Sequence, residues 1–127
     1  MSRLLLVEDE EVIRNALRRM LTRHGHTVSE AGTVAEALRY DLSSFDLILA
    51  DLRLPGADGT TLIPHAKQTP VLVMTSYASV RSAVESMKQG AVDYIAKPFD
   101  HHELLTLIDS IIHKPSSPNI VGNVATT

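Results

Sequence analysis

The chain of 127 residues contains no cysteine and no tryptophan, and its aromatic residues are three tyrosines and two phenylalanines. Without thiols it can carry no disulfide framework, no cysteine-ligated zinc and no thiol catalysis. A block of Lys and Arg is also missing, as are basic residues interleaved with aromatics, and the formal net charge is −3. Because nucleic-acid surfaces need concentrated positive charge, we expect no direct nucleic-acid binding by this segment.

Long hydrophobic runs are absent as well. No apolar stretch approaches the roughly 20 residues that a membrane-spanning helix needs, and the N-terminus leads into a short apolar run without a small-residue cleavage site. We therefore expect a soluble cytoplasmic protein with no membrane contact. The length fits one domain whose core is large enough to fold without disulfides or a structural metal.

Apolar runs of strand length alternate with segments of helical periodicity from the N-terminus to about residue 113. Five such βα units predict an α/β domain with a parallel sheet and helices on both faces. Strands are expected at residues 2–7, 27–30, 46–50, 70–74 and 91–96. Helices are expected at residues 10–23, 33–40, 60–67, 79–89 and from about 100 until Pro115.

Individual segments add detail to this pattern. The run at 46–50 is apolar throughout and is expected to be a central strand, whereas the short run at 27–30 is expected at a sheet edge. Pro64 should shorten or distort the third helix, because proline removes a backbone hydrogen bond. Residues 115–127 have linker composition, so the domain is expected to span residues 1–114.

Polar side chains stand at the ends of four predicted strands: Glu8 and Asp9, Asp51, Thr75, and Lys97. In open α/β sheets the carboxyl ends of parallel strands form the ligand edge, so these side chains should converge. Each residue alone has an ordinary alternative as a helix cap, a turn residue or a solvated loop residue. The repetition of this placement in separate segments favours a site.

Three carboxylates gathered at one edge need neutralising charge, since two unit charges 4 Å apart repel by about 4 kcal/mol at an effective dielectric of 20. A hard cation such as Mg²⁺, together with the Lys97 ammonium, would supply it. Positioned cations suit phosphoryl transfer, whose transition state spreads negative charge over oxygens. Asp51 could then act as the nucleophile and form an aspartyl phosphate.

These residues, with the turn-rich stretch 54–59, Thr75-Ser76 and the segment 90–99, closely resemble the receiver domain of bacterial two-component response regulators. The resemblance covers about residues 1–113. It implies the flavodoxin-like (βα)5 three-layer sandwich with strand order 2-1-3-4-5. It also implies that residues 115–127 are a linker or the start of a missing output domain.

The resemblance implies a role for each site residue. Asp51 would be the phosphoacceptor, Glu8 and Asp9 would bind Mg²⁺ (with Mn²⁺ as a substitute) together with Asp51 and the Arg53 carbonyl, and Lys97 would contact the phosphoryl group. Thr75 and Tyr94 would be the switch pair, the two residues that respond to phosphorylation. The Lys97–Pro98 peptide bond would be cis. The bulk of Arg53 and Tyr77 leads us to expect slow dephosphorylation.

The function implied is a phosphorylation-dependent signalling switch and not a conventional enzyme. A histidine kinase or small phosphodonor would phosphorylate the domain, which would then form a homodimer through the surface of residues 79–89, the last strand and the last helix. Residues 77–80 and 119–123 resemble the sigma-54-dependent transcriptional activators, whose output domain would follow. A stand-alone receiver, a phosphorelay intermediate and a pseudo-receiver remain alternatives.

Two other protein classes fit less well. A Mg²⁺-dependent phosphatase of the haloacid dehalogenase type also uses an aspartate nucleophile after a strand, but it needs a second Asp where Arg53 stands. A flavodoxin-like cofactor binder would need a phosphate-binding loop after the first strand. This chain has Glu8 and Asp9 at that place instead.

The first predicted helix carries a basic stripe formed by Arg14, Arg18, Arg19 and Arg23. Helical spacing would pair some of these side chains with Glu10 and Glu11. The stripe is interpreted as a solvated face, with docking of an acidic kinase surface as the alternative.

Overall fold

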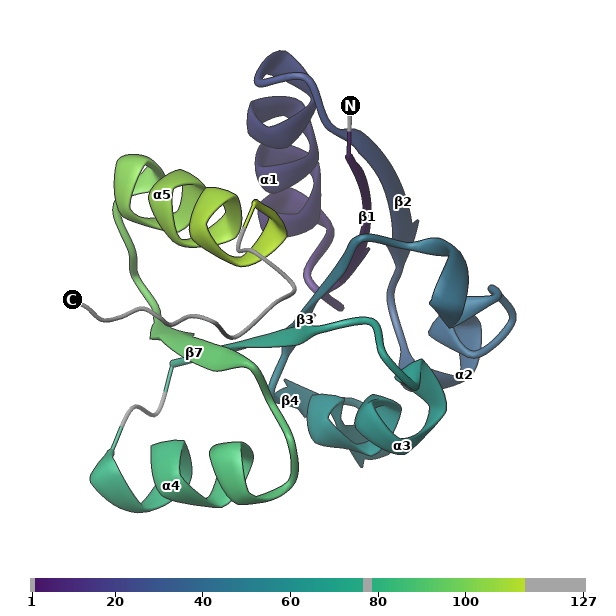
Figure 1. Cartoon of the computed structure of the whole chain (residues 1–127), viewed down its shortest axis with the longest axis vertical. Helices are drawn as coiled ribbons and strands as arrows, with labels where there is room; N and C mark the ends of the chain where they lie inside the picture. Colours follow the sequence, from purple (N-terminus) through teal and green to yellow (C-terminus); the bar gives the residue numbers. More distant parts are fainter. Residues whose placement is uncertain (1, 77–78, 114–127) are drawn as a thin grey trace, which may run out of the picture.

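The computed structural model describes residues 2–76 and 79–113, and it contains five parallel strands that form one sheet (Figure 1). These strands are β1 (Arg3–Val7), β2 (Thr27–Ala31), β3 (Leu47–Asp51), β6 (Val71–Thr75) and β7 (Asp93–Ala96). Their order in the sheet is β2-β1-β3-β6-β7. This is the predicted order 2-1-3-4-5, so the flavodoxin-like fold is confirmed.

The helices lie on both faces of the sheet, as Figure 1 shows. One face is covered by α1 (Glu11–Arg23) and α5 (His101–Ile112), and the other by α2 (Val34–Ala37), α3 (Ile63–Ala66) and α4 (Val80–Lys88). Strand β3 lies in the middle of the sheet and is buried along its whole length. Strand β2 lies at an edge, as its short apolar run predicted.

Two hydrophobic clusters hold these layers together. Leu17 and Leu21 of α1 pack with Leu104 and Ile108 of α5 on one face of the sheet. The second cluster lies on the other face, beneath α2 and α3. Because β1, β3 and β6 are buried from both sides, their ends are fixed relative to one another.

The helix ends follow local sequence signals. Gly25 (φ +91°) follows α1 and Gly90 (φ +109°) follows α4, and this left-handed backbone favours glycine. The Ser79 hydroxyl accepts a hydrogen bond from the Ser82 backbone N–H and so caps α4. Asp100 caps α5 in the same way, through the His102 N–H.

Two of the predicted helices are shorter than a full amphipathic helix. Helix α2 ends at Ala37 although the sequence predicted a helix at residues 33–40, and the residues that follow Ala37 form a turn. Helix α3 is four residues long with Pro64 in its first turn and follows the 3-10 helix η2 (Gly59–Leu62), which confirms the expected distortion. A further 3-10 helix, η1 (Leu42–Ser44), precedes β3.

A small hairpin lies between β3 and α3 in the segment that the sequence marked as a turn-rich loop. Strand β4 (Arg53–Leu54) pairs antiparallel with β5 (Ala57–Asp58). Among the described residues, no helix is long and apolar enough to cross a bilayer. Tyr77 and the similarity at 119–123 lie outside the described residues, as does the expected linker at 115–127.

The edge of the fold near the start of β2 contains a buried histidine nitrogen. Nδ1 of His26 has no hydrogen-bond partner among the described residues. Burial lowers the pKa of His26 below its ordinary value of 6.5, and the nearby His24 and His113 act in the same direction, whereas Asp109 opposes them. Protonation of His26 therefore opposes folding.

A lowered pKa gives a predicted pH dependence. The contribution of neutral His26 should be fully present above its unfolded pKa near 6.5 and should be lost as the pH falls through the folded value. We expect the urea midpoint of the wild-type chain to fall between about pH 7.5 and about pH 5.5. His26→Gln should show a smaller fall, and an equal fall in both proteins would contradict this assignment.

Candidate functional site

Three carboxylates from two strand ends meet at one edge of the sheet. Glu8 follows β1 and is fully buried, Asp9 is next to it and exposed, and Asp51 ends β3 with 8% of its surface exposed. One oxygen from each carboxylate lies within 4.8 Å of the other two. The parallel pairing of β1 with β3 brings these residues together, as the sequence pattern predicted.

Lys97 joins two of these carboxylates through its ammonium group. Its Nζ donates to Glu8 Oε1 at 2.6 Å and to Asp51 Oδ2 at 2.9 Å. Lys97 follows β7, and its backbone N–H donates to the Thr75 carbonyl at 2.7 Å. The ammonium therefore bridges residues that lie 89 and 46 positions away in the chain.

Burial and hydrogen bonding have opposite effects on the pKa values of this ion pair. Burial raises the pKa of Glu8 above its ordinary value, although hydrogen bonds from Lys97 and the Glu10 backbone N–H lower it in part. For Lys97, burial alone would lower the pKa, but its hydrogen bonds to Glu8 and Asp51 raise it above the ordinary value. The Lys97 side chain therefore remains charged at neutral pH.

Thr75 and Tyr94 lie on one face of the sheet. Thr75 ends β6 and is 1% exposed, and Tyr94 of β7 is half-buried. Val73, two residues before Thr75, pairs with Tyr94 across the two strands. Since side chains two positions apart share a face, Thr75 and Tyr94 both face the side that α4 covers.

Two other predicted features are located by the structure. The Lys97–Pro98 peptide bond is cis, which confirms the expectation from the resemblance. Arg53 is the first residue of β4, and its backbone N–H lies 3.3 Å from Asp51 Oδ1. Arg53 thus lies beside the carboxylate cluster.

Sequence reasoning missed a glycine that packs against Asp51. A Cβ on Gly59 would collide with the backbone carbonyl oxygen of Asp51 and would lie 3.3 Å from the Ala50 Cβ. The Gly59 N–H donates to the Leu52 carbonyl at 2.8 Å. The sequence shows only a Gly in a turn-rich segment, so the close approach is visible only after folding.

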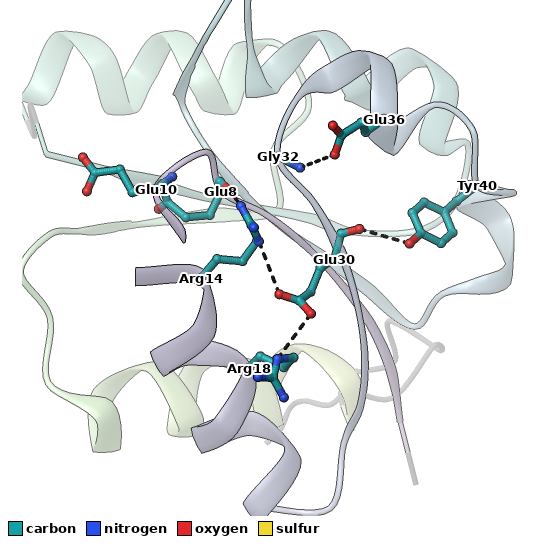
Figure 2. A network of polar contacts seen from close by, with 8 residues as sticks. All are labelled: Glu8, Glu10, Arg14, Arg18, Glu30, Gly32, Glu36 and Tyr40. Atoms are coloured by element: carbon teal, nitrogen blue, oxygen red, sulfur yellow. Dashed lines mark hydrogen bonds and ion pairs between the residues drawn. The ribbon is translucent and has the colours of Figure 1, made fainter. Parts of the chain in front are cut away.

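The role of Arg14 was also missed, and the predicted pairing of the first helix was wrong. Arg14 Nε lies 3.3 Å from Glu30 Oε1 and Arg18 Nε lies 3.2 Å from Glu30 Oε2, so these arginines pair with strand β2 and not with Glu10 or Glu11 (Figure 2). Arg14 also donates from Nη1 to the backbone carbonyl of Glu8 at 2.8 Å. A helical-spacing rule considers only partners on the same helix.

The cluster fits a hard divalent cation. Carboxylate oxygens are the ligands that Mg²⁺ prefers, and Mg²⁺ is commonly bound by one or two carboxylates with water filling other positions. Glu8, Asp9 and Asp51 place three such groups close enough to share one ion. Asp9 is exposed, so the cluster opens to solvent.

A comparison with protein families matches residues 4–109 to the response regulator receiver domain. The chain belongs to this family. Phosphorylation and Mg²⁺ binding at an acidic pocket are features of receiver domains, which are signalling proteins and not conventional enzymes.

The curated relatives include transcriptional regulators. The receiver domain is 39% identical to the response regulator protein FleR of Pseudomonas aeruginosa over 84% of this chain and 24% of FleR. It is 40% identical to the DNA-binding transcriptional regulator NtrC of Klebsiella pneumoniae, again over 84% of this chain and 24% of NtrC. Both relatives are of the sigma-54 activator class, and the chain spans about a quarter of their length.

A solved receiver structure has the same fold. The receiver domain resembles the solution structure of the beryllofluoride-activated NtrC4 receiver domain dimer with a TM-score of 0.80 and 31% identity. The match covers 88% of this chain and 97% of the NtrC4 receiver chain. Similarity to receivers therefore extends from sequence to the arrangement of the whole domain.

The tight contact at Gly59 generates a stability prediction. Gly59→Ala should lower the free energy of unfolding by about 1–3 kcal/mol, because the added methyl group meets backbone that cannot rotate away. Urea denaturation measures this loss. Gly32→Ala is the matched control, since its Cβ would meet Arg14 Nη1 at an ordinary 3.5 Å and should change stability by less than about 0.5 kcal/mol. Equal effects of the two substitutions would refute the proposed steric cause.

Proposed function

We propose that this receiver domain accepts a phosphoryl group on Asp51 and that the phosphorylated domain acts as a signalling switch. The observation that carries the proposal is the Lys97 ammonium, held 2.9 Å from Asp51 Oδ2 and 2.6 Å from Glu8 Oε1. Together with Asp9, these residues put an acceptor carboxylate, a fixed cation and oxygen ligands for a metal in one site.

The proposed reaction is an in-line phosphoryl transfer. An oxygen of Asp51 forms a bond to phosphorus while the bond to the donor breaks, and the electron pair of that bond stays on the donor, as an imidazole nitrogen or a carboxylate oxygen. The donor is a phosphohistidine of a cognate sensor histidine kinase or a small acyl phosphate. Lys97 balances the negative charge on the transferred oxygens, since its ammonium already lies at the acceptor carboxylate.

Glu8, Asp9, Asp51 and the Arg53 carbonyl would hold Mg²⁺, or Mn²⁺ in its place. The bound ion would add positive charge beside the phosphoryl oxygens. Lys97 pairs with both Glu8 and Asp51 and so compensates their repulsion. The bulk of Arg53, which is exposed beside the acceptor, supports slow dephosphorylation because it would crowd incoming water.

The phosphoryl group would be sensed by Thr75 and Tyr94. Phosphorylation adds roughly two negative charges and three acceptor oxygens at Asp51. Thr75 lies at the end of the strand next to β3, so its hydroxyl can turn toward such oxygens, and Tyr94 shares its sheet face. A shift of this pair would alter the α4-β7-α5 surface, which is the surface of residues 79–89, the last strand and the last helix expected from the sequence.

The α4 part of that surface is apolar. Val80, Val84 and Met87 are 82%, 46% and 45% exposed, and their spacing places them on one side of α4. Exposed apolar side chains that cluster on a helix commonly mark an interaction surface. The similarity to the NtrC4 receiver dimer supports the same use here, with homodimerisation after phosphorylation.

The output of the switch is proposed to be transcription regulation in the cytoplasm. FleR and NtrC support an output domain of the sigma-54 activator type after the receiver. In this arrangement the output domain would contact DNA and the receiver would not. The receiver would control that domain through its dimerisation state.

Direct phosphorylation tests the proposed chemistry. The wild-type chain should gain one phosphoryl adduct when it is incubated with acetyl phosphate and Mg²⁺, and intact-mass analysis measures the adduct. Asp51→Asn should gain none, because its amide is not a nucleophile. Glu36→Gln removes a carboxylate of α2 outside the cluster and should react as the wild type does. An adduct of equal yield on Asp51→Asn would reject Asp51 as acceptor.

Sedimentation velocity tests the proposed dimer surface. Beryllofluoride with Mg²⁺ should shift the wild-type chain from monomer toward dimer, whereas Val84→Asp should stay monomeric because it places a charge in the apolar patch of α4. Val12→Asp changes a valine that is 82% exposed on α1 and should dimerise normally. Dimerisation of Val84→Asp at wild-type concentrations would place the interface elsewhere.

A further inference from the structure

The backbone of Glu8 is held from two sides by groups outside the carboxylate cluster. Its N–H donates to the Ala31 carbonyl of β2 at 3.0 Å, and its carbonyl accepts from Arg14 Nη1 at 2.8 Å. The side chain is fixed separately, since Oε1 accepts from Lys97 and Oε2 from the Glu10 N–H. Arg14 therefore contacts the main chain where β1 ends and the acidic loop begins.

The Arg14 guanidinium is itself anchored. Its Nε pairs with Glu30 Oε1 at 3.3 Å, and the other oxygen of Glu30 pairs with Arg18 at 3.2 Å. Glu30 belongs to edge strand β2, and its backbone carbonyl accepts from the Tyr40 hydroxyl at 3.0 Å. Figure 2 shows this network, in which Arg14 links the Glu8 carbonyl to β2.

We infer that Arg14 is a positioning residue for the divalent cation site. It holds the loop of Glu8 and Asp9 in the place where both carboxylates reach Asp51, and Glu30 fixes the Arg14 side chain in turn. The inference rests on the proposed function only in that this site binds a divalent cation. Arg14 contacts a backbone carbonyl of the acidic loop and is not proposed to touch the metal or the phosphoryl group.

A role through charge and a role in positioning the loop predict opposite changes in cation affinity when Arg14 is removed. If the guanidinium acted only through its charge, its removal beside a cation site would strengthen cation binding. If it holds the loop, its removal lets the carboxylates move apart and weakens binding. The sign of the change in affinity therefore separates the two roles.

The test is Mn²⁺ binding to the full chain without any phosphodonor, with free Mn²⁺ measured by electron paramagnetic resonance. Arg14→Met should weaken binding roughly tenfold, within the range seen when groups that orient metal ligands are removed. Arg19→Met is the matched control, because Arg19 is an exposed arginine of the same helix and its change leaves the Arg14 contacts to Glu8 and Glu30 in place. It should bind as the wild type does, and Asp9→Asn should bind more weakly than either.

Arg14→Lys keeps the charge but cannot span both Glu8 and Glu30 with a planar fork. Its affinity should lie between those of the wild type and Arg14→Met, and it provides the test if Arg14→Met fails to fold. Affinity equal to or tighter than wild type in Arg14→Met, or equal to wild type in Arg14→Lys, would overturn the inference.

The outcomes separate this inference from the proposed phosphotransfer. If wild type binds Mn²⁺ and Arg14→Met binds it weakly, Arg14 is a positioning residue even if Asp51 gains no phosphoryl group. If wild type binds no Mn²⁺, the inference fails together with the metal site. If Asp51 is phosphorylated and Arg14→Met binds Mn²⁺ normally, the inference alone is rejected.

Discussion

The crowding of three carboxylates at the end of one sheet is the constraint on which the rest of this receiver domain depends. Glu8, Asp9 and Asp51 repel one another, and Lys97 offsets that repulsion. Lys97 lies in the loop that follows the edge strand β7, whereas the three acids follow β1 or end β3. Such an arrangement persists only if the strand ends cannot separate. The buried β3 and the two hydrophobic clusters provide that rigidity.

The same constraint explains why a chemical change at Asp51 could be felt elsewhere. Lys97 follows β7, and its N–H is bonded to the Thr75 carbonyl, so the charged cluster is coupled to the two strands that carry Thr75 and Tyr94. Altering the charge at Asp51 changes what the Lys97 ammonium can bond to. Helix α4, which carries the exposed apolar side chains, covers the face of the sheet toward which Thr75 and Tyr94 point.

The side of the site formed by Glu8 and Asp9 is supported by strand β2. Strand β2 contributes no carboxylate to the cluster, yet its Ala31 carbonyl and Glu30 side chain hold the end of β1, directly and through Arg14. An edge strand usually has few constraints because it is paired on one side only. Here Tyr40 and α1 tie it down at the point nearest the acidic loop.

The sequence by itself determined the βα alternation, the central place of β3, the shortened helix at Pro64 and the set of residues at the strand ends, because periodicity and proline chemistry act locally. The comparisons with known receivers confirm the family that these residues resemble. Only the tertiary structure decided that Lys97 bridges Glu8 and Asp51, that Gly59 packs on Asp51, and that Arg14 pairs with Glu30 instead of its helix neighbours. Those contacts join residues distant in sequence, so they depend on strand register and side-chain packing, which no local pattern contains.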